Sequence, residues 1–175
     1  MKTVDVIKEL SEWDRQGRYL FAKRDLAKIF APASENNFNQ MLRRLVEKEV
    51  LVRVAQGIYL NPQSSHVGSN TIGDIAMALR PGEYVFESME SALSQWGRIS
   101  QIPVDRITLV TTGRKGTYKT PYGTIEFTHT KSSANEILDN TISRPNHSLP
   151  IATETYAIVN LRRSGRNLNM LTEGD

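Results

Sequence analysis

Residues 34–48 read SENNFNQMLRRLVEK and decide how the first part of the chain is interpreted. The apolar residues of this stretch follow the spacing i, i+3, i+4 and i+7 and are Phe38, Met41, Leu42 and Leu45. Residues at this spacing share one face of an α-helix. Ser34 is a good N-cap because its hydroxyl can accept from the first free backbone amides. The stretch therefore predicts a helix that begins after Ser34 and ends near Lys48.

The opposite face of this predicted helix carries amide and guanidinium groups. Its residues are Asn36, Gln40, Arg43, Arg44 and Glu47, with Asn37 and Asn39 on the flanks. Asn and Gln can pair with adenine and Arg with guanine, and all of them also bind phosphates. A helix that is merely solvated would more often carry Glu and Lys, which form helices better. The composition therefore predicts a recognition helix for the major groove of double-stranded DNA.

Two further helices are expected upstream. The first has an apolar stripe at i, i+4 and i+7, formed by Val6, Leu10 and Trp13. Gly17 ends this pattern. A shorter helix is expected over residues 23–30, followed by a tight turn, because Pro32 biases the residue before it away from helical angles.

A hairpin is expected downstream, where residues 51–60 read LVRVAQGIYL. Two short β-type runs flank Ala55-Gln56-Gly57, and three loop residues with Gly near the end suit a tight hairpin. Three helices followed by a hairpin is the order of a winged helix-turn-helix domain, whose second and third helices dock on DNA. We therefore expect such a domain over residues 1–62.

The predicted DNA-binding residues come from the second helix, the third helix with its cap, and the hairpin. They are Lys23, Arg24, Ser34, Asn36, Asn37, Asn39, Gln40, Arg43, Arg44, Arg53 and Gln56. Arg53 and Gln56 are expected on the wing, near the backbone that flanks the bound site. The alternative interpretation is a small helical subdomain used for protein contacts.

The charge distribution agrees with an N-terminal polyanion site. The net charge is +3, and residues 1–62 hold 11 Lys and Arg against 8 Asp and Glu, whereas the rest of the chain holds 11 of each. The whole excess is therefore N-terminal, where it would attract a polyanion. Ordinary solvated helix faces would give the same count, since surface Lys and Arg are common.

The remainder of the chain predicts a second domain over residues 70–175, after a polar linker over 61–69. The expected helices cover 71–80, 89–96 and 154–161, and the expected strands cover 84–86, 106–111, 118–120, 124–130 and 149–151. Ser88 is expected to cap the second of these helices, Gly97 to end it, and Trp96 to lie in the core. The fold class is therefore α+β, with helices packed on an antiparallel or mixed sheet.

Composition excludes several kinds of chemistry. The chain has no Cys and only 3 His, so thiolate metal sites, disulfides and a cysteine nucleophile are ruled out. We expect neither a metal nor a cofactor, and His66 is read as a solvent-exposed loop residue. No stretch approaches the ~20 apolar residues that span a bilayer, so we expect a cytoplasmic protein without a membrane partner.

Two basic stretches and a set of acidic and histidine residues were weighed as further sites. Residues 113–116 and 162–166 could hold phosphate, but the former lacks the phosphate-loop spacing and precedes a strand, so solvated segments are favoured. An enzyme acting on nucleic acid or nucleotides would draw its catalytic groups from Asp105, Glu126, His129, Glu136, Asp139 and His147. These form no recognised catalytic spacing, and we expect no enzymatic activity.

Several short motifs resemble a known family. They are the wing end Gln56-Gly57-Ile58-Tyr59-Leu60-Asn61-Pro62, the helix Ser88-Met89-Glu90-Ser91-Ala92-Leu93-Ser94-Gln95-Trp96-Gly97, the segment Thr111-Thr112-Gly113 and the segment Ala152-Thr153-Glu154. Together, over roughly residues 1–155, the chain resembles the AbiEi-type antitoxins of type IV toxin–antitoxin systems. Thr155-Tyr156-Ala157 stands where many relatives carry Pro-Glu-Arg.

The resemblance implies a repressor that binds double-stranded DNA at an operator upstream of its own gene. It also implies a C-terminal domain needed for antitoxicity, and a nucleotidyltransferase-like toxin that is opposed without an obligatory stable complex. Independently of the resemblance, operator symmetry commonly requires two reading heads, so a dimer on DNA is expected. The alternatives are the nucleic-acid-processing enzyme named above and a protein-interaction module that does not regulate its own operon.

Overall fold

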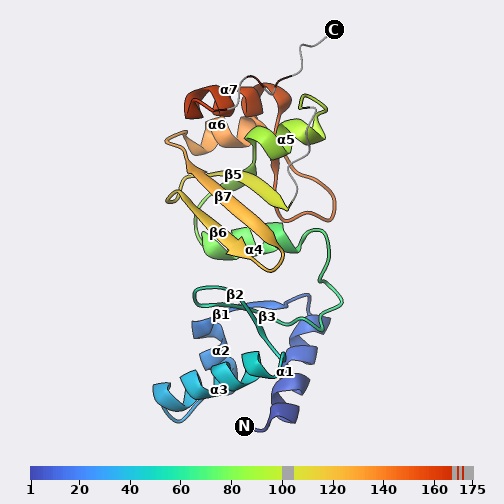
Figure 1. The fold of residues 1–175 in the computed structure, drawn as a ribbon, viewed down its shortest axis with the longest axis vertical. Helices are drawn as coiled ribbons and strands as arrows, with labels where there is room; N and C mark the ends of the chain where they lie inside the picture. The colour runs from blue at the N-terminus through green and yellow to red at the C-terminus, as the bar shows by residue number, and fades with distance from the viewer. Residues whose placement is uncertain (100–104, 167–168, 170, 172–175) are drawn as a thin grey trace. The chain divides into compact units, whose positions relative to one another are not determined.

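The computed structural model describes residues 1–99, 105–166, 169 and 171. The chain divides into two compact units, Met1–Thr71 and Ile72–Asp175. Within the described part there are seven α-helices together with an antiparallel sheet and a mixed sheet, which confirms the α+β class (Figure 1). No helix in that part is both long enough and apolar enough to cross a bilayer.

The first unit combines three helices with a three-stranded sheet. Its elements are α1 (Thr3–Arg15), β1 (Leu20–Ala22), α2 (Lys23–Phe30), α3 (Glu35–Glu47), β2 (Val52–Ala55) and β3 (Ile58–Leu60). The sheet has the order β1-β3-β2, and both pairings are antiparallel. The expected helices and hairpin are present, whereas β1 was not predicted. Its three residues are too few to show an alternating pattern.

One hydrophobic cluster holds the three helices and the sheet of the first unit together. The helices contribute Val6, Leu10, Leu26, Phe30, Phe38, Met41, Leu42 and Leu45, all buried, and the other segments contribute Phe21, Leu51 and Tyr59. Because each helix buries one stripe and exposes the other, this cluster fixes the rotation of every helix about its own axis.

The segment after β3, which the sequence predicts to be a linker, makes several contacts with the first unit. The amide of Asn61 donates to the carbonyl of Tyr19 at 2.9 Å, and the Asp14 carboxylate on α1 accepts from the Ser64 hydroxyl and from the amide of Ser65. His66 is exposed, as expected, and its Nε2 lies 3.1 Å from the backbone oxygen of Asp14. Local composition is typical of a linker, but serine hydroxyls also serve as donors to a distant carboxylate.

The second unit is built on a six-stranded sheet with the order β6-β7-β5-β4-β9-β8. Its strands are β4 (Val85–Glu87), β5 (Arg106–Thr111), β6 (Gly116–Thr120), β7 (Gly123–His129), β8 (Thr141–Ile142) and β9 (Ile151–Ala152). The pairs β5–β7 and β4–β9 are parallel and the others are antiparallel, so the sheet is mixed. Its helices are α4 (Thr71–Leu79), α5 (Met89–Gln95), α6 (Ala134–Asp139) and α7 (Glu154–Ser164), of which α6 was not predicted.

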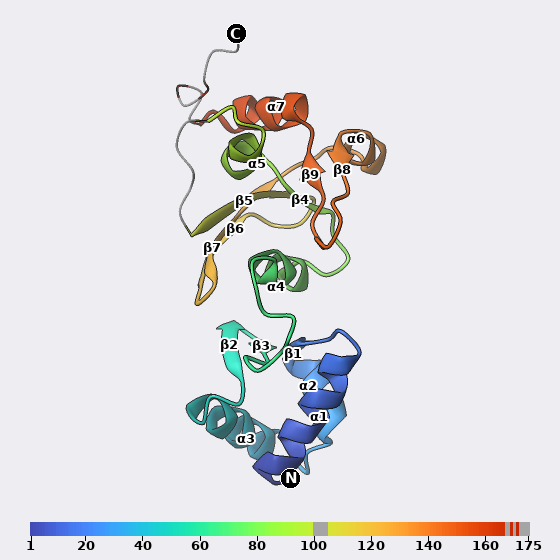
Figure 2. The same ribbon diagram turned by 90° about the vertical axis from the view of Figure 1, so that its right-hand side faces the viewer.

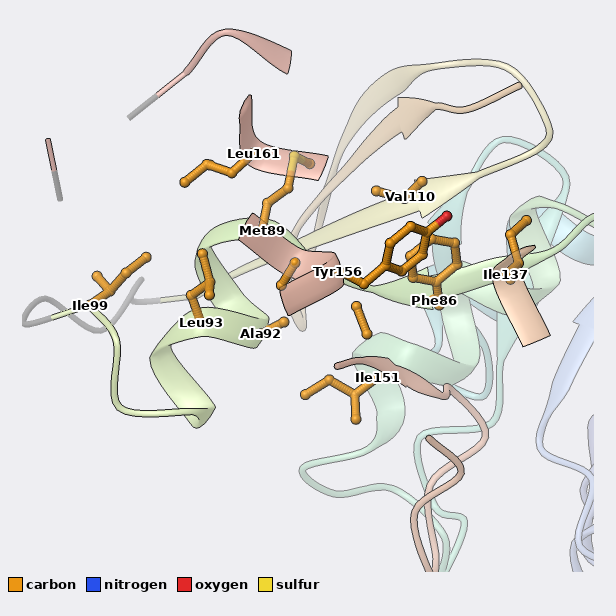
Figure 3. Packing of buried hydrophobic residues seen from close by; sticks show 12 residues of the cluster. Phe86, Met89, Ala92, Leu93, Ile99, Val110, Ile137, Ile151, Tyr156 and Leu161 are labelled. Carbon is orange, nitrogen blue, oxygen red and sulfur yellow. The ribbon is translucent and has the colours of Figure 1, made fainter. Parts of the chain in front are cut away.

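Helices cover both faces of this sheet. The two views agree that α5 and α7 lie over one face and α4 over the other (Figure 1, Figure 2). Between the sheet and α7, the rings of Phe86 and Tyr156 stack with centroids 5.6 Å apart, and Val110 lies beside them (Figure 3). Buried apolar contacts of this kind supply most of the stability of the unit.

A small polar network joins α5 to the centre of the sheet. The hydroxyl of Thr108 donates to the Ser88 carbonyl at 2.6 Å and is 3.0 Å from the Ser91 amide, for which it is the acceptor. Ser88 occupies the N-cap position of α5, but its side chain makes no capping hydrogen bond, so the predicted cap is present in position only. Trp96 was expected in the core, but it lies at the end of α5 and is 40% exposed. Its indole N–H donates to the Ala152 carbonyl at 3.0 Å. Because the indole N–H meets this backbone acceptor at the surface, part of the Trp96 ring stays exposed to water.

The contact between Asp14 and the serine segment predicts a pH dependence. The Ser64 hydroxyl, followed by the amide and hydroxyl of Ser65, lowers the pKa of Asp14. A carboxyl with a depressed folded-state pKa contributes stability that is complete above its unfolded pKa, ~3.9, and is lost as the pH falls through the folded value. We expect residues 61–66 to undock from α1 as the pH falls below about 4.

The Ser65 amide shift and its hydrogen exchange, followed by NMR between pH 6 and pH 2.5, measure this undocking. The matched control is Asp14→Asn, in which the segment should lose its acid transition. An identical transition in both forms would contradict the assignment to Asp14.

Candidate nucleic-acid interface

The polar side of α3 is fixed by the residues at its start and on its buried side. The hydroxyl of Ser34 accepts from the Asn37 amide at 3.2 Å, so the predicted N-cap is present. Phe38, Met41, Leu42 and Leu45 are all buried, as the spacing predicted. These contacts leave the helix only one orientation, and the polar residues between them must face outward.

Most of the predicted DNA-binding residues are on the surface of the first unit. Nine of the eleven are exposed, and the half-buried pair is Lys23 and Asn39. Within residues 1–99 and 105–166, no ion pair engages Arg43, Arg44 or Arg53. These guanidinium groups therefore keep their charge and their donors available to a polyanion.

A cleft of about 590 Å³ lies between α3 and the β2–β3 hairpin. It is lined by Lys23, Asn39, Leu42, Arg43, Val46, Glu47, Arg53, Gln56, Gly57 and Tyr59. The structure thus brings together five of the predicted residues, which are Lys23, Asn39, Arg43, Arg53 and Gln56. Three cations and one carboxylate line the cleft, so its net charge is positive.

The other predicted residues lie outside this cleft. Lys23 also borders a second groove of about 720 Å³ between α2 and α3, which Arg24 and Ser34 line together with apolar residues. The remaining four are exposed along α3 and line neither groove; they are Asn36, Asn37, Gln40 and Arg44. The predicted set therefore covers the exposed face of α3 and parts of two neighbouring grooves, both of which Lys23 lines.

A backbone contact sets the position of the hairpin relative to α2. The amide of Lys23, at the first turn of α2, donates to the Gly57 carbonyl at 2.8 Å. Amides in the first turn of a helix have no partner within the helix, so the hairpin satisfies one of them. Gly57 has φ +72°, in the left-handed region, and turns this carbonyl toward the helix.

Two parts of the candidate interface were not predicted from the sequence. Tyr59 lines the cleft from β3, and its ring is buried. The Lys23–Gly57 contact joins residues 34 positions apart, and nothing in the local pattern indicates it. The sequence could have predicted only the alternation of exposed and buried side chains in the hairpin, with Arg53 outward and Val54 inward.

Four of the six residues considered for catalysis are held in structural contacts. The Glu126 carboxylate lies between the guanidinium groups of Arg166 and Arg106, and these lower the pKa of Glu126 despite its partial burial. A carboxylate with a lowered pKa is a poor proton acceptor near neutral pH. Arg166 also pairs with Glu90 at 2.8 Å, so the 162–166 stretch is not simply the solvated end that was expected.

Three other candidates also have local partners. The Nδ1 of His129 lies 2.7 Å from the Gly113 carbonyl, and that of His147 lies 2.9 Å from the Pro145 carbonyl. Glu136 pairs with Arg163 at 3.2 Å. Over the part of the chain that the structure describes, no three His, Asp or Glu side chains gather in a way that could hold a metal ion.

Comparison with known proteins places the chain in a family. The family described as "Family of unknown function (DUF6088)" matches residues 6–147, most of the chain, and the chain therefore belongs to it. No curated protein sequence matches. Among solved structures, the crystal structure of RV2827C protein from Mycobacterium tuberculosis has a similar fold, with a TM-score of 0.61 and 14% identity. The alignment covers 89% of this chain and 58% of that one, so the chain spans less than two thirds of that protein.

The hairpin turn yields a stability prediction. A Cβ at Gly57 would meet nothing within 4 Å, so Gly57→Ala should cost only the strain of a positive φ, about 1 kcal/mol of unfolding free energy. Gly57→Asn should cost less, because Asn tolerates the left-handed region. Urea unfolding monitored by circular dichroism measures both variants. Equal stability of the wild type and Gly57→Ala would show that the turn does not hold this conformation.

Proposed function

We propose that this member of the DUF6088 family is a sequence-specific DNA-binding transcriptional repressor. In this proposal the first unit is a winged helix-turn-helix domain. Helix α3 enters the major groove, and the β2–β3 hairpin lies against the adjacent phosphate backbone. The observation that carries the proposal is the single surface formed by the polar face of α3 and the cationic cleft beside it.

The chemistry of this surface favours DNA over a protein partner. Its exposed residues are mainly amides and guanidinium groups, whereas the core of a protein interface is enriched in aromatic residues and depleted of most charged ones. Asn36, Gln40 and Arg44, exposed along the middle of the face, have the side-chain types that pair with base edges. Arg43 and Arg53 flank the cleft and suit phosphates, which position a protein without reading sequence.

The resemblance to AbiEi-type antitoxins supports a more specific role. We infer that the operator lies upstream of the protein's own gene and that two copies bind its half-sites. The second unit would then oppose a nucleotidyltransferase-like toxin without a stable complex. Ser91, within the motif that carries the resemblance, bonds Thr108 on β5, so part of that motif has a structural role in this chain.

Binding to the protein's own upstream DNA tests the proposal. Arg43→Ala combined with Arg44→Ala should abolish specific binding in a gel-shift assay, since each lost base or phosphate contact costs ~1–3 kcal/mol. The matched control is Lys8→Ala combined with Arg15→Ala, which removes the same charge from the exposed side of α1. Control binding should fall only slightly.

Salt dependence separates this interface from weak charge attraction. If about six phosphates are neutralised, the affinity of the wild type should fall about a thousandfold between 50 and 200 mM salt. The slope should be shallower for the Arg43 and Arg44 double variant. Specific binding that survives in that variant would remove α3 from the interface.

A further inference from the structure

A groove of about 390 Å³ lies within the first unit, between α1, the end of α3 and the segment after β3. It shares no lining residue with the cleft proposed for DNA. Small-molecule sites of this size combine an apolar wall with a few polar groups that fix the orientation of the ligand. Here the apolar wall includes Ile7, Leu10 and Val50, and the polar residues include Lys48, Glu49 and Asn61.

Asn61 supplies a hydrogen-bond donor inside the groove. It lines the groove although only 5% of its surface is exposed. Its side-chain oxygen accepts from the Gln63 amide at 3.0 Å, and its backbone amide donates to Tyr19. Within the described residues its side-chain nitrogen, Nδ2, makes no hydrogen bond, and Nδ2 is not one of the fully enclosed polar atoms. Nδ2 therefore keeps access to the groove and two donors for a bound molecule.

The groove also offers one unpaired charge of each sign. Lys48 and Glu49 are exposed, and within residues 1–99 and 105–166 no ion pair engages either of them. The other charged residues of the groove, Asp14 and Arg15, already have partners, on the segment after β3 and on α1. Adjacent charges of opposite sign complement a molecule that itself carries both charges, rather than a simple anion or cation.

The backbone that carries these two charges is fixed. Lys48 is the C-cap of α3, and Glu49 follows in the left-handed conformation with φ +55°. The Glu49 amide donates to the Val46 carbonyl at 3.0 Å, and the Val50 amide donates to the Leu45 carbonyl at 2.9 Å. These two bonds form the Schellman ending of a helix. A ligand would therefore meet a preorganised backbone, which lowers the entropic cost of binding.

Both elements that border the DNA cleft continue into this groove. On α3, Glu47 lines the cleft and the next residue, Lys48, lines the groove. On the other side, Tyr59 of β3 lines the cleft and Asn61, two residues later, lines the groove. A molecule that bridges Lys48 and Asn61 would hold α3 and the hairpin at one spacing. Such a ligand favours the DNA-binding arrangement if it binds that arrangement more tightly.

We propose that this groove binds a free α-amino acid with an aliphatic side chain, and that the bound amino acid strengthens DNA binding. The α-carboxylate would accept from Nδ2 of Asn61 beside Lys48, and the α-ammonium group would pair with Glu49. The side chain would pack against the apolar wall. The regulatory part rests on the proposed function, whereas the ligand site itself does not.

Binding is tested on the full chain without DNA. Isothermal titration calorimetry with L-valine, L-leucine and L-methionine measures affinity, and NMR of the labelled protein should show shifts of the amides of residues 48–50 and of Asn61 and Gln63. Isocaproate lacks the ammonium group of leucine and isoamylamine lacks the carboxylate, so each should bind at least tenfold more weakly than L-leucine. Isocaproate binding as tightly as L-leucine, or no binding of any of the three amino acids at millimolar concentration, would overturn the site.

Two variants remove one contact each. Asn61→Asp keeps the oxygen that the Gln63 amide needs and removes the donor, so L-leucine should bind at least tenfold more weakly, with circular dichroism confirming the fold. Glu49→Gln should weaken L-leucine binding but leave isocaproate binding unchanged. Asn135→Asp makes the same chemical change at an exposed position of the second unit and should bind L-leucine as the wild type does. Wild-type affinity in both Asn61→Asp and Glu49→Gln contradicts the assignment.

The regulatory role is tested with the protein's own upstream DNA. Saturating amino acid should raise the DNA affinity of the wild type at least fivefold and leave that of Asn61→Asp unchanged. Equal DNA affinity of the wild type with and without bound amino acid would overturn the regulatory role alone. Absence of any DNA binding would overturn the proposed function and the regulatory role together, while the titrations without DNA still decide the ligand site.

Discussion

The burial of four apolar residues on one side of α3 is the constraint on which the proposed interface depends. Phe38, Met41, Leu42 and Leu45 pack against the rest of the first unit, so the helix cannot rotate without exposing them. Each such side chain contributes about 1.5–3 kcal/mol when buried, far more than any single surface contact. The direction of the amide and guanidinium groups is therefore decided on the opposite side of the helix, by residues that touch no ligand.

The sequence predicted the orientation of α3 well, because the interactions that set it join residues close together in the chain. The helical spacing of the apolar residues and the cap at Ser34 act within one or two turns, and both are present. The contacts that could not be predicted join residues that are distant in sequence. The Lys23–Gly57 bond that positions the hairpin, and the Asp14 contacts that bind the segment after β3, join parts of the chain whose proximity only the fold creates.

The second unit illustrates the same limit more strongly. Parallel pairing of β5 with β7 and of β4 with β9 requires connections that periodicity does not encode, and the short α6 and β8 gave no usable pattern. Trp96 was misjudged because hydrophobic character was weighed above the polar edge of the indole. Residues 113–116 were judged by motif spacing and by the strand that follows them. Their proximity to Arg80 became visible only once α4 and the β5–β6 loop were placed together.

The two tryptophans have a practical consequence. Trp13 lies in the first unit, with the Arg18 guanidinium 5.4 Å from its ring, and Trp96 lies in the second. Each unit thus holds one indole, and the sequence contains no others. Replacing either by phenylalanine leaves a chain whose intrinsic fluorescence reports on one unit alone. The protein therefore carries a separate optical reporter in each half, which allows the melting of the two halves to be followed independently without any added label.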